Sequence, residues 1–188
     1  MSGANGRTAR WRAVRANEKG EFDLGQQQIS YVYVTVPSAE ERIALLEASG
    51  HGMVYVNGEP RTGDVYGYGY VSLPVRLKAG ENSFLFSGTR GGLSVRLIEP
   101  RAPVSLSVAD PTLPDFREGE KGSRPGAVLL INATGKEATG FTMEAAYEGG
   151  RGEKSRLPAV APMTVRKVPF RVPEPPAGQK TAALTLRL

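Results

Sequence analysis

The sequence contains no cysteine and a single histidine, His51. Without cysteine there is no disulfide, no thiolate nucleophile and no cysteine-ligated zinc site. One imidazole is also too few for an ordinary transition-metal site. Oxygen ligands are present, but Asp64, Asp110 and Asp115 do not form the Asp-x-Asp-x-Asp-Gly loop that is typical of calcium binding. We therefore expect neither a metal nor another cofactor.

The chain also lacks any run of about 20 apolar residues, the length that a membrane-spanning helix needs. Its first residues, MSGANGRTARWRAV, are positively charged but are not followed by the apolar stretch of a signal peptide. As written, the chain shows no export signal, and it does not by itself indicate a compartment. We expect no membrane partner.

Catalytic motifs are missing as well. The sequence has no Gly-x-Ser-x-Gly nucleophile elbow and no Gly-Lys-Ser or Gly-Lys-Thr phosphate loop. His51 follows Ser49, but a catalytic pair needs a third group that orients it, so we interpret His51 as a loop or strand-end residue. Glu40 and Glu41 are adjacent, and neighbouring side chains on a strand point to opposite faces. These observations predict that the chain is not an enzyme.

The formal net charge of +5 comes from 24 Lys and Arg residues against 19 Asp and Glu residues. Nucleic-acid-binding proteins concentrate basic residues in a stripe or patch. The one basic cluster here is Arg7, Arg10, Arg12 and Arg15, which we interpret as a basic arm over residues 1–15. Elsewhere the two signs are mixed, so no nucleic-acid partner is expected.

What the chain does contain is apolar residues at every second position, the period of a half-buried β-strand. In the clearest example Val32, Val34 and Val36 face one way, and Tyr31 and Tyr33 face the other. The segments with this pattern are 32–36, 43–48, 54–56, 71–77, 84–86 and 93–97, and then 104–108, 128–131, 141–147, 168–172 and 184–188.

Turn and strand-end signals refine this pattern. Asn57-Gly58 predicts a tight hairpin turn. Pro74 cannot donate a ladder hydrogen bond, so its strand is expected at a sheet edge or at a bulge. The apolar parity changes between Val165 and Val168, which predicts a β-bulge near Arg166 and Lys167.

Many short strands with almost no helix predict an all-β fold built as β-sandwiches. Two prolines, Pro100 and Pro103, interrupt the pattern midway. We therefore predict two β-sandwich domains, over residues 16–99 and 104–188, joined by a linker at 100–103.

The segment Tyr66-Gly67-Tyr68-Gly69-Tyr70 is unusual. If it is extended, its three tyrosines share one face and form a row of exposed rings that suits a sugar or a partner surface. If the glycines bend it, the tyrosines instead cover the edge of the sandwich.

The first half resembles a galactose-binding-like jelly roll, through Val54-Tyr55-Val56-Asn57-Gly58 and the segment from Leu73 to Phe86 with its Lys-x-Gly-x-Asn motif. The second half, with Leu130 to Gly135 and Arg166 to Phe170, resembles an immunoglobulin-like module. This pair is similar to the non-catalytic region that precedes the α/β-hydrolase domain of secreted bacterial peptidases and esterases. The catalytic serine, acid and histidine of those enzymes have no counterparts in this chain.

The resemblance implies an accessory region that positions or caps a hydrolase catalytic domain, in a secreted or periplasmic protein. A carbohydrate-binding module with a polysaccharide partner is the alternative. By the same resemblance its ligand-binding residues would be Tyr66, Tyr68, Tyr70, Asp64 and Arg61. A small enzyme with a site that joins His51 or the Glu40–Glu41 pair is the least favoured reading.

Overall fold

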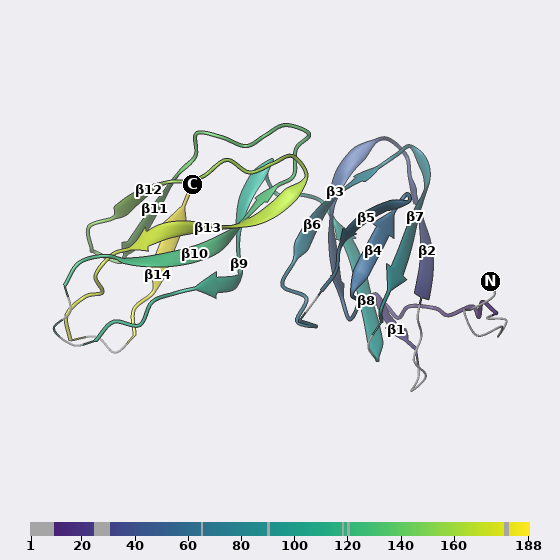
Figure 1. Ribbon diagram of the computed structural model, residues 1–188, viewed down its shortest axis with the longest axis horizontal. Helices are drawn as coiled ribbons and strands as arrows, with labels where there is room; N and C mark the ends of the chain where they lie inside the picture. The colour runs from purple at the N-terminus through teal and green to yellow at the C-terminus, as the bar shows by residue number, and fades with distance from the viewer. Residues whose placement is uncertain are drawn as a thin grey trace.

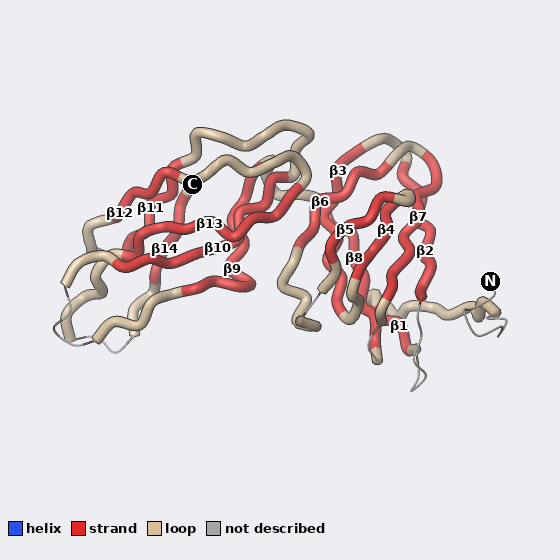
Figure 2. Tube along the Cα trace, viewed as in Figure 1, coloured by secondary structure: helices blue, strands red, loops and turns tan. Residues whose placement is uncertain are grey.

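The computed structural model describes residues 10–24, 31–64, 66–89, 91–117, 119, 121–178 and 181–188. All regular structure in these residues is β-strand, as Figure 2 shows, and the strands form four antiparallel sheets. The all-β fold predicted from the alternating pattern is thereby confirmed. Figure 1 shows the strands in two groups, β1 to β8 and β9 to β14, on either side of the connection at residues 99–103.

The first group of strands forms a sandwich of two four-stranded sheets. One sheet has the order β1 (Glu21–Asp23), β8 (Gly92–Ile98), β3 (Arg42–Ser49) and β6 (Ser72–Leu77); the other has the order β2 (Tyr31–Ser38), β7 (Gly80–Ser87), β4 (Met53–Val56) and β5 (Glu59–Thr62). The inward residues of both sheets share one core, in which Phe84, Phe86, Val54, Val75 and Leu46 are almost fully buried. The predicted parity of strands 32–36 and 54–56 is correct.

The second group forms a smaller sandwich of two three-stranded sheets. The orders are β13 (Thr164–Val172), β10 (Arg124–Asn132), β9 (Val104–Thr112) and β12 (Glu153–Arg156), β11 (Thr142–Tyr147), β14 (Leu184–Arg187). Their core is separate from the first and includes Val128, Leu130, Met143, Val168 and Phe170.

The two turn motifs of the first sandwich meet in space. Asn57 and Gly58 have positive φ angles of 51° and 87° and form the predicted hairpin between β4 and β5. The Asn57 side chain donates to Oδ1 of the fully buried Asn82, at 2.9 Å, and its own Oδ1 accepts from the Ser83 amide. Asn82 in turn bonds the backbone of Lys78 in both directions. The motif residues therefore hold two turns together.

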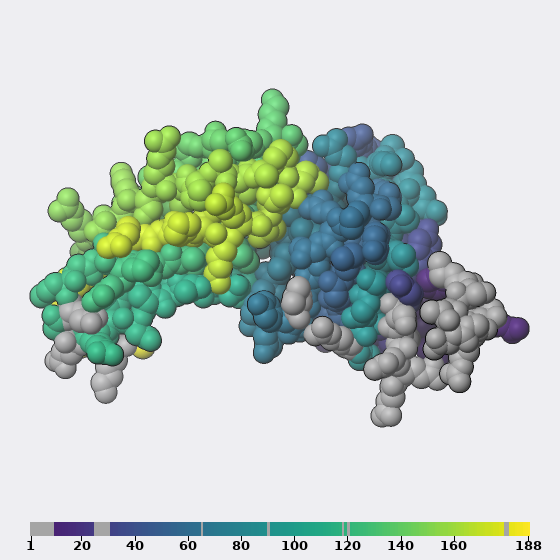
Figure 3. All heavy atoms as spheres, in the orientation of Figure 1, coloured from purple at the N-terminus to yellow at the C-terminus, as the bar shows by residue number. Residues whose placement is uncertain are grey.

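A third apolar cluster joins the two sandwiches. Ile43 and Leu45 lie on the outer face of β3. They belong to one cluster with Ile131 of β10, Ala133, which follows β10, and Val165 of β13. Strand β6, which carries Pro74, is an edge strand as predicted and contacts β10 and β13. Figure 3 shows the two halves meeting along this junction.

This contact explains why one prediction is wrong. β13 pairs with β10 without interruption from Thr164 to Val172, so there is no bulge at Arg166 or Lys167. Val165 breaks the inward parity because it faces outward and is covered by the first sandwich. The register shift lies instead between Ala127 and Leu129, where β10 pairs with β9. Near that shift Val108, predicted to face the core, is 68% exposed.

Candidate binding surfaces

The Tyr-Gly segment is a turn and not an extended strand. Residues 66–68 carry turn and bend geometry, none of residues 66–70 belongs to a strand, and Gly67 and Gly69 have positive φ angles of 75° and 66°. Glycine adopts such angles without the steric cost that a Cβ brings. Of the two alternatives that the sequence left open, the extended one is therefore wrong, and the glycine-bent one describes the backbone.

Asp64 stabilises this turn through hydrogen bonds to backbone amides. Its side chain is 7% exposed, and its two carboxylate oxygens accept hydrogen bonds from the backbone N–H groups of Tyr68, at 3.1 Å, and Gly50, at 3.2 Å. The Asp64 carbonyl also accepts from the Gly67 amide. Asp64 thus supports the tyrosine turn, and its oxygens face the chain's own backbone.

The tyrosine side chains nevertheless remain at the surface. Tyr66, Tyr68 and Tyr70 are 81%, 68% and 39% exposed. The rings of Tyr68 and Tyr70 stack on each other, with centroids 5.1 Å apart and planes 20° apart. The turn therefore presents a stacked pair of rings with a third ring close in sequence.

Arg61 points elsewhere. Its guanidinium Nη2 donates to the carbonyl of Met163 in the second sandwich, at 2.5 Å. It lines a cavity of about 260 Å³ together with Val75 and Met163. Burial lowers the pKa of Arg61 from its ordinary value, and Glu59 opposes that shift. The structure therefore brings Asp64 and the tyrosines together, and it places Arg61 at the junction between the sandwiches.

His51 lies beneath the same turn. It is only 4% exposed, and its ring packs edge-on against Phe86 at a centroid distance of 5.1 Å. Its Nδ1 atom is buried without a hydrogen-bond partner. His51 and Asp64 line a cavity of about 10 Å³, close to the volume of one water probe. Burial lowers the pKa of His51, and the nearby Asp64 carboxylate opposes that shift.

The lowered pKa of His51 predicts a loss of stability in mild acid. The unfolded chain takes up the proton near the ordinary pKa of about 6.5, before the folded state does, so unfolding gains protons as the pH falls. The contribution of neutral His51 to the free energy of unfolding is fully present above about pH 6.5. As the pH falls toward the pKa of His51 in the folded protein, the free energy of unfolding decreases by at most roughly 1.4 kcal/mol per pH unit. Urea unfolding between about pH 7 and pH 5 measures this slope. His51→Leu should flatten it, and equal slopes in both proteins would contradict the assignment.

A second aromatic surface was not predicted from the sequence. Trp11, Tyr31 and Tyr33 are 61%, 50% and 53% exposed, and they line a groove of about 390 Å³ on the first sandwich. The outward parity of Tyr31 and Tyr33 was visible in the sequence. The position of Trp11 beside them was not, because it depends on how residues 10–14 fold back along β2.

Two carboxylates that were considered from the sequence, Glu41 for catalysis and Asp110 for calcium binding, have other contacts. Glu41 pairs with Arg76 at 3.1 Å, and Asp110 pairs with Lys167 at 2.9 Å. Within the described ranges no three His, Asp or Glu side chains are grouped closely enough to hold a metal ion. The same residues include no helix with the length and apolarity needed to span a bilayer.

Neither a family model nor a curated protein matches this chain. Among solved structures, a calcium-binding mutant of Bacteroides uniformis beta-glucuronidase 2 aligns with 76% of this chain and 21% of its own, at 12% identity and a TM-score of 0.32. The chain therefore spans about a fifth of that enzyme. A similarity of this size assigns neither family nor activity, and the all-β sandwich architecture is what the structure itself establishes.

Proposed function

We propose that the chain is a non-catalytic accessory region that holds binding surfaces in a fixed position beside a hydrolase catalytic domain. The observation that carries this proposal is the apolar junction between the sandwiches. Leu45 and Ile131 are 6% and 4% exposed, so the junction excludes water as a domain core does. A two-domain body joined in this way is a suitable rigid spacer.

One hydrogen bond across the junction and the turn contacts within the first sandwich support the same role. The Arg61–Met163 hydrogen bond crosses it, and a charged donor makes such a bond stronger than a neutral one. The turn motifs at Asn57 and Asn82, which carry the resemblance to hydrolase-associated jelly rolls, stiffen the first sandwich. By that resemblance the protein acts outside the cytoplasm, with a hydrolase catalytic domain or a polysaccharide as its partner.

A turnover assay tests the non-catalytic part of the proposal. The intact chain is incubated at micromolar concentration with chromogenic glycosides, esters and peptide anilides, beside the His51→Leu variant. His51 is the only imidazole in the chain, and its ring is buried against Phe86. We expect no turnover above background for either protein. Turnover by the intact chain that disappears in the variant would contradict the proposal.

The second candidate function is carbohydrate binding through Tyr66, Tyr68 and Tyr70. The exposed, stacked Tyr68–Tyr70 pair favours it, because the outer faces of such rings can pack against the apolar face of a sugar. Asp64 supports this surface from below but directs its oxygens at the backbone, so the ligand contacts would come from the rings.

Tyr68→Ala separates these two candidates. Because the ring is 68% exposed, its removal should leave the melting temperature nearly unchanged, whereas loss of a buried aromatic ring costs about 3–5 kcal/mol. A glycan array and polysaccharide-retardation gels then compare the variant with the intact chain. If a glycan retains the intact chain but not Tyr68→Ala, the result supports carbohydrate binding by the tyrosine surface. Retention that is unchanged excludes it as the binding surface.

A further inference from the structure

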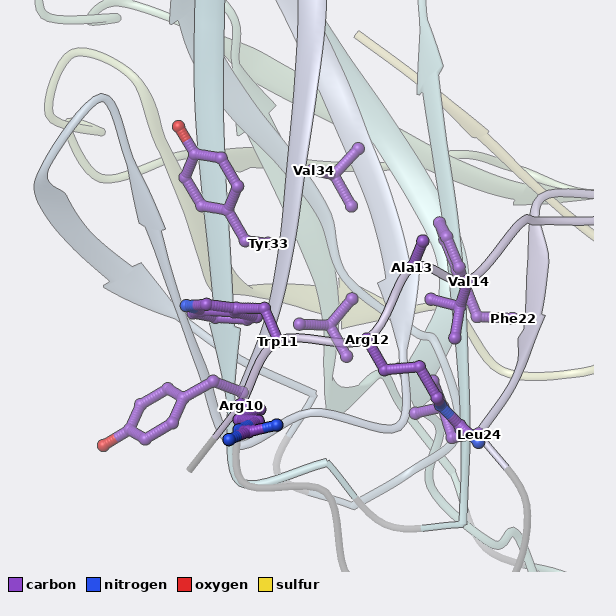
Figure 4. A pocket seen from close by; sticks show the side chains of 11 residues that line it. Arg10, Trp11, Arg12, Ala13, Val14, Phe22, Leu24, Tyr33 and Val34 are labelled. Atoms are coloured by element: carbon purple, nitrogen blue, oxygen red, sulfur yellow. The ribbon is translucent and has the colours of Figure 1, made fainter. Parts of the chain in front are cut away.

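A groove on the first sandwich lies apart from the tyrosine turn. Its volume is about 390 Å³, and it runs between the segment 10–14 and strand β2. Figure 4 shows Trp11 and Tyr33 on one side of the groove and Val14, Phe22 and Leu24 on the other. One side of the groove is therefore lined by Trp11 and Tyr33, and the other by apolar side chains.

The strand pattern produces the aromatic wall. Val32 is 5% exposed and belongs to the core, so Tyr31 and Tyr33, one residue to either side, point outward. Trp11 meets Tyr33 edge to face, with centroids 6.4 Å apart and planes 60° apart. In this arrangement the edge of one ring contacts a face of the other, and the rings do not stack, so other ring faces remain available to a ligand.

The charge of the groove has one sign. Arg10 and Arg12 both line it and are exposed, and no Asp or Glu is among its lining residues in the described part of the chain. Arginine binds carboxylate and sulfate groups through two parallel N–H donors. The groove therefore combines flat aromatic rings with the guanidinium groups of two arginines.

We propose that this groove binds an acidic saccharide. The apolar face of a sugar ring packs on Trp11 or Tyr33, and the sugar's carboxylate or sulfate accepts hydrogen bonds from Arg10 or Arg12. This site is separate from the tyrosine turn, and it does not depend on the accessory role proposed above.

Single-stranded nucleic acid is the other polymer that combines anionic groups with flat rings. Proteins that bind it use a basic groove that follows the backbone and rings on which successive bases stack. Here the groove has two arginines, and the Trp11 and Tyr33 rings are inclined at 60°. This geometry suits a sugar better than a row of stacked bases.

The test is affinity gel electrophoresis of the intact chain in gels that contain polygalacturonate, a neutral galactan or an oligothymidylate. We expect retardation by polygalacturonate, weaker retardation by galactan, and an affinity for polygalacturonate that drops about tenfold in Trp11→Ala and in Arg12→Gln. Trp11 is 61% exposed, so the melting temperature should not change. Tyr68→Ala should bind like the intact chain, which separates this site from the tyrosine turn.

Arg151→Gln is the matched charge control, because it removes one exposed positive charge from the other sandwich. It should bind polygalacturonate as the intact chain does. Equal weakening in Arg12→Gln and Arg151→Gln would show non-specific attraction to a polyanion and overturn the proposal. Tighter binding to oligothymidylate than to polygalacturonate, or no retardation by the acidic polymer, would also overturn it.

Discussion

Val56→Asp should unfold the first sandwich. Val56 is 6% exposed and lies in the core that both sheets share, beside Phe84 on the paired strand β7. An aspartate there loses its hydration without gaining a partner, and burial of an unpaired charge costs several kcal/mol even after the protein relaxes. A domain of this size has a total stability of only about 5–15 kcal/mol, so the folded population should largely disappear.

The measurement is circular dichroism and thermal melting, with Thr35→Asp as the matched control. Thr35 is exposed on the outward face of β2, in the same sheet as β4, so the carboxylate of the introduced aspartate stays in water. We expect the control to melt close to the unsubstituted chain. A Val56→Asp protein as stable as the Thr35→Asp protein would mean that the inward and outward faces of β4 are wrongly assigned.

Leu45→Asp should separate the two sandwiches without unfolding either of them. Leu45 points out of the first core, since its neighbours Ala44 and Leu46 belong to that core, and it packs against Ile131 and Val165. A carboxylate in this position can regain water only if the junction opens. The second sandwich should then move independently about the connection at residues 99–103.

Backbone ¹⁵N relaxation measures this effect directly. We expect two rotational correlation times in Leu45→Asp, one for each sandwich, with chemical shifts of the two cores unchanged. Thr35→Asp serves again as the control and should keep the behaviour of the intact chain. A Leu45→Asp protein that still tumbles as one body would show that the apolar cluster does not hold the junction.

Alternating patterns predicted most of the strands that have one face in a core, whereas β5 and β12, which contribute no residue to either core, are not among the predicted segments. Val32, Val54 and Phe86 are buried where the period places them, and Pro74 lies on an edge strand as its missing N–H requires. Local chemistry also determined the Asn57-Gly58 turn. These features depend on neighbouring residues, so a single sequence contains the information.

Predictions failed where contacts between distant segments decide the outcome. The parity of Val165 predicts a bulge, whereas Val165 in fact packs against a cluster that includes Leu45, 120 residues away in the other sandwich. The sequence leaves Tyr66–Tyr70 open between an extended segment and a glycine-bent one, because alternation cannot distinguish a strand from a turn whose glycines take positive φ. Nothing in the sequence indicates that Trp11 lies beside Tyr33, because the two residues become neighbours only after folding.

Residues that carry the resemblance and residues that it implies as ligand contacts both make structural hydrogen bonds. Asn57 and Asn82, which carry the turn motifs, bond each other and form a joint between two turns. Arg61, taken as a ligand contact, bonds Met163 across the junction, and Asp64 bonds the backbone of its own turn. Residues that resemble a binding motif here maintain the shape on which the exposed rings are presented.

If the apolar junction holds in solution, the two sandwiches form one rigid body that carries the exposed aromatic surfaces. ¹⁵N relaxation of the intact chain tests it most directly, because it reports how each half tumbles in solution. We expect one rotational correlation time shared by amides of β3 and β10, on the two sides of the cluster that contains Leu45 and Ile131. Two distinct correlation times, each typical of a domain of about 90 residues, would show that the junction does not hold the sandwiches together.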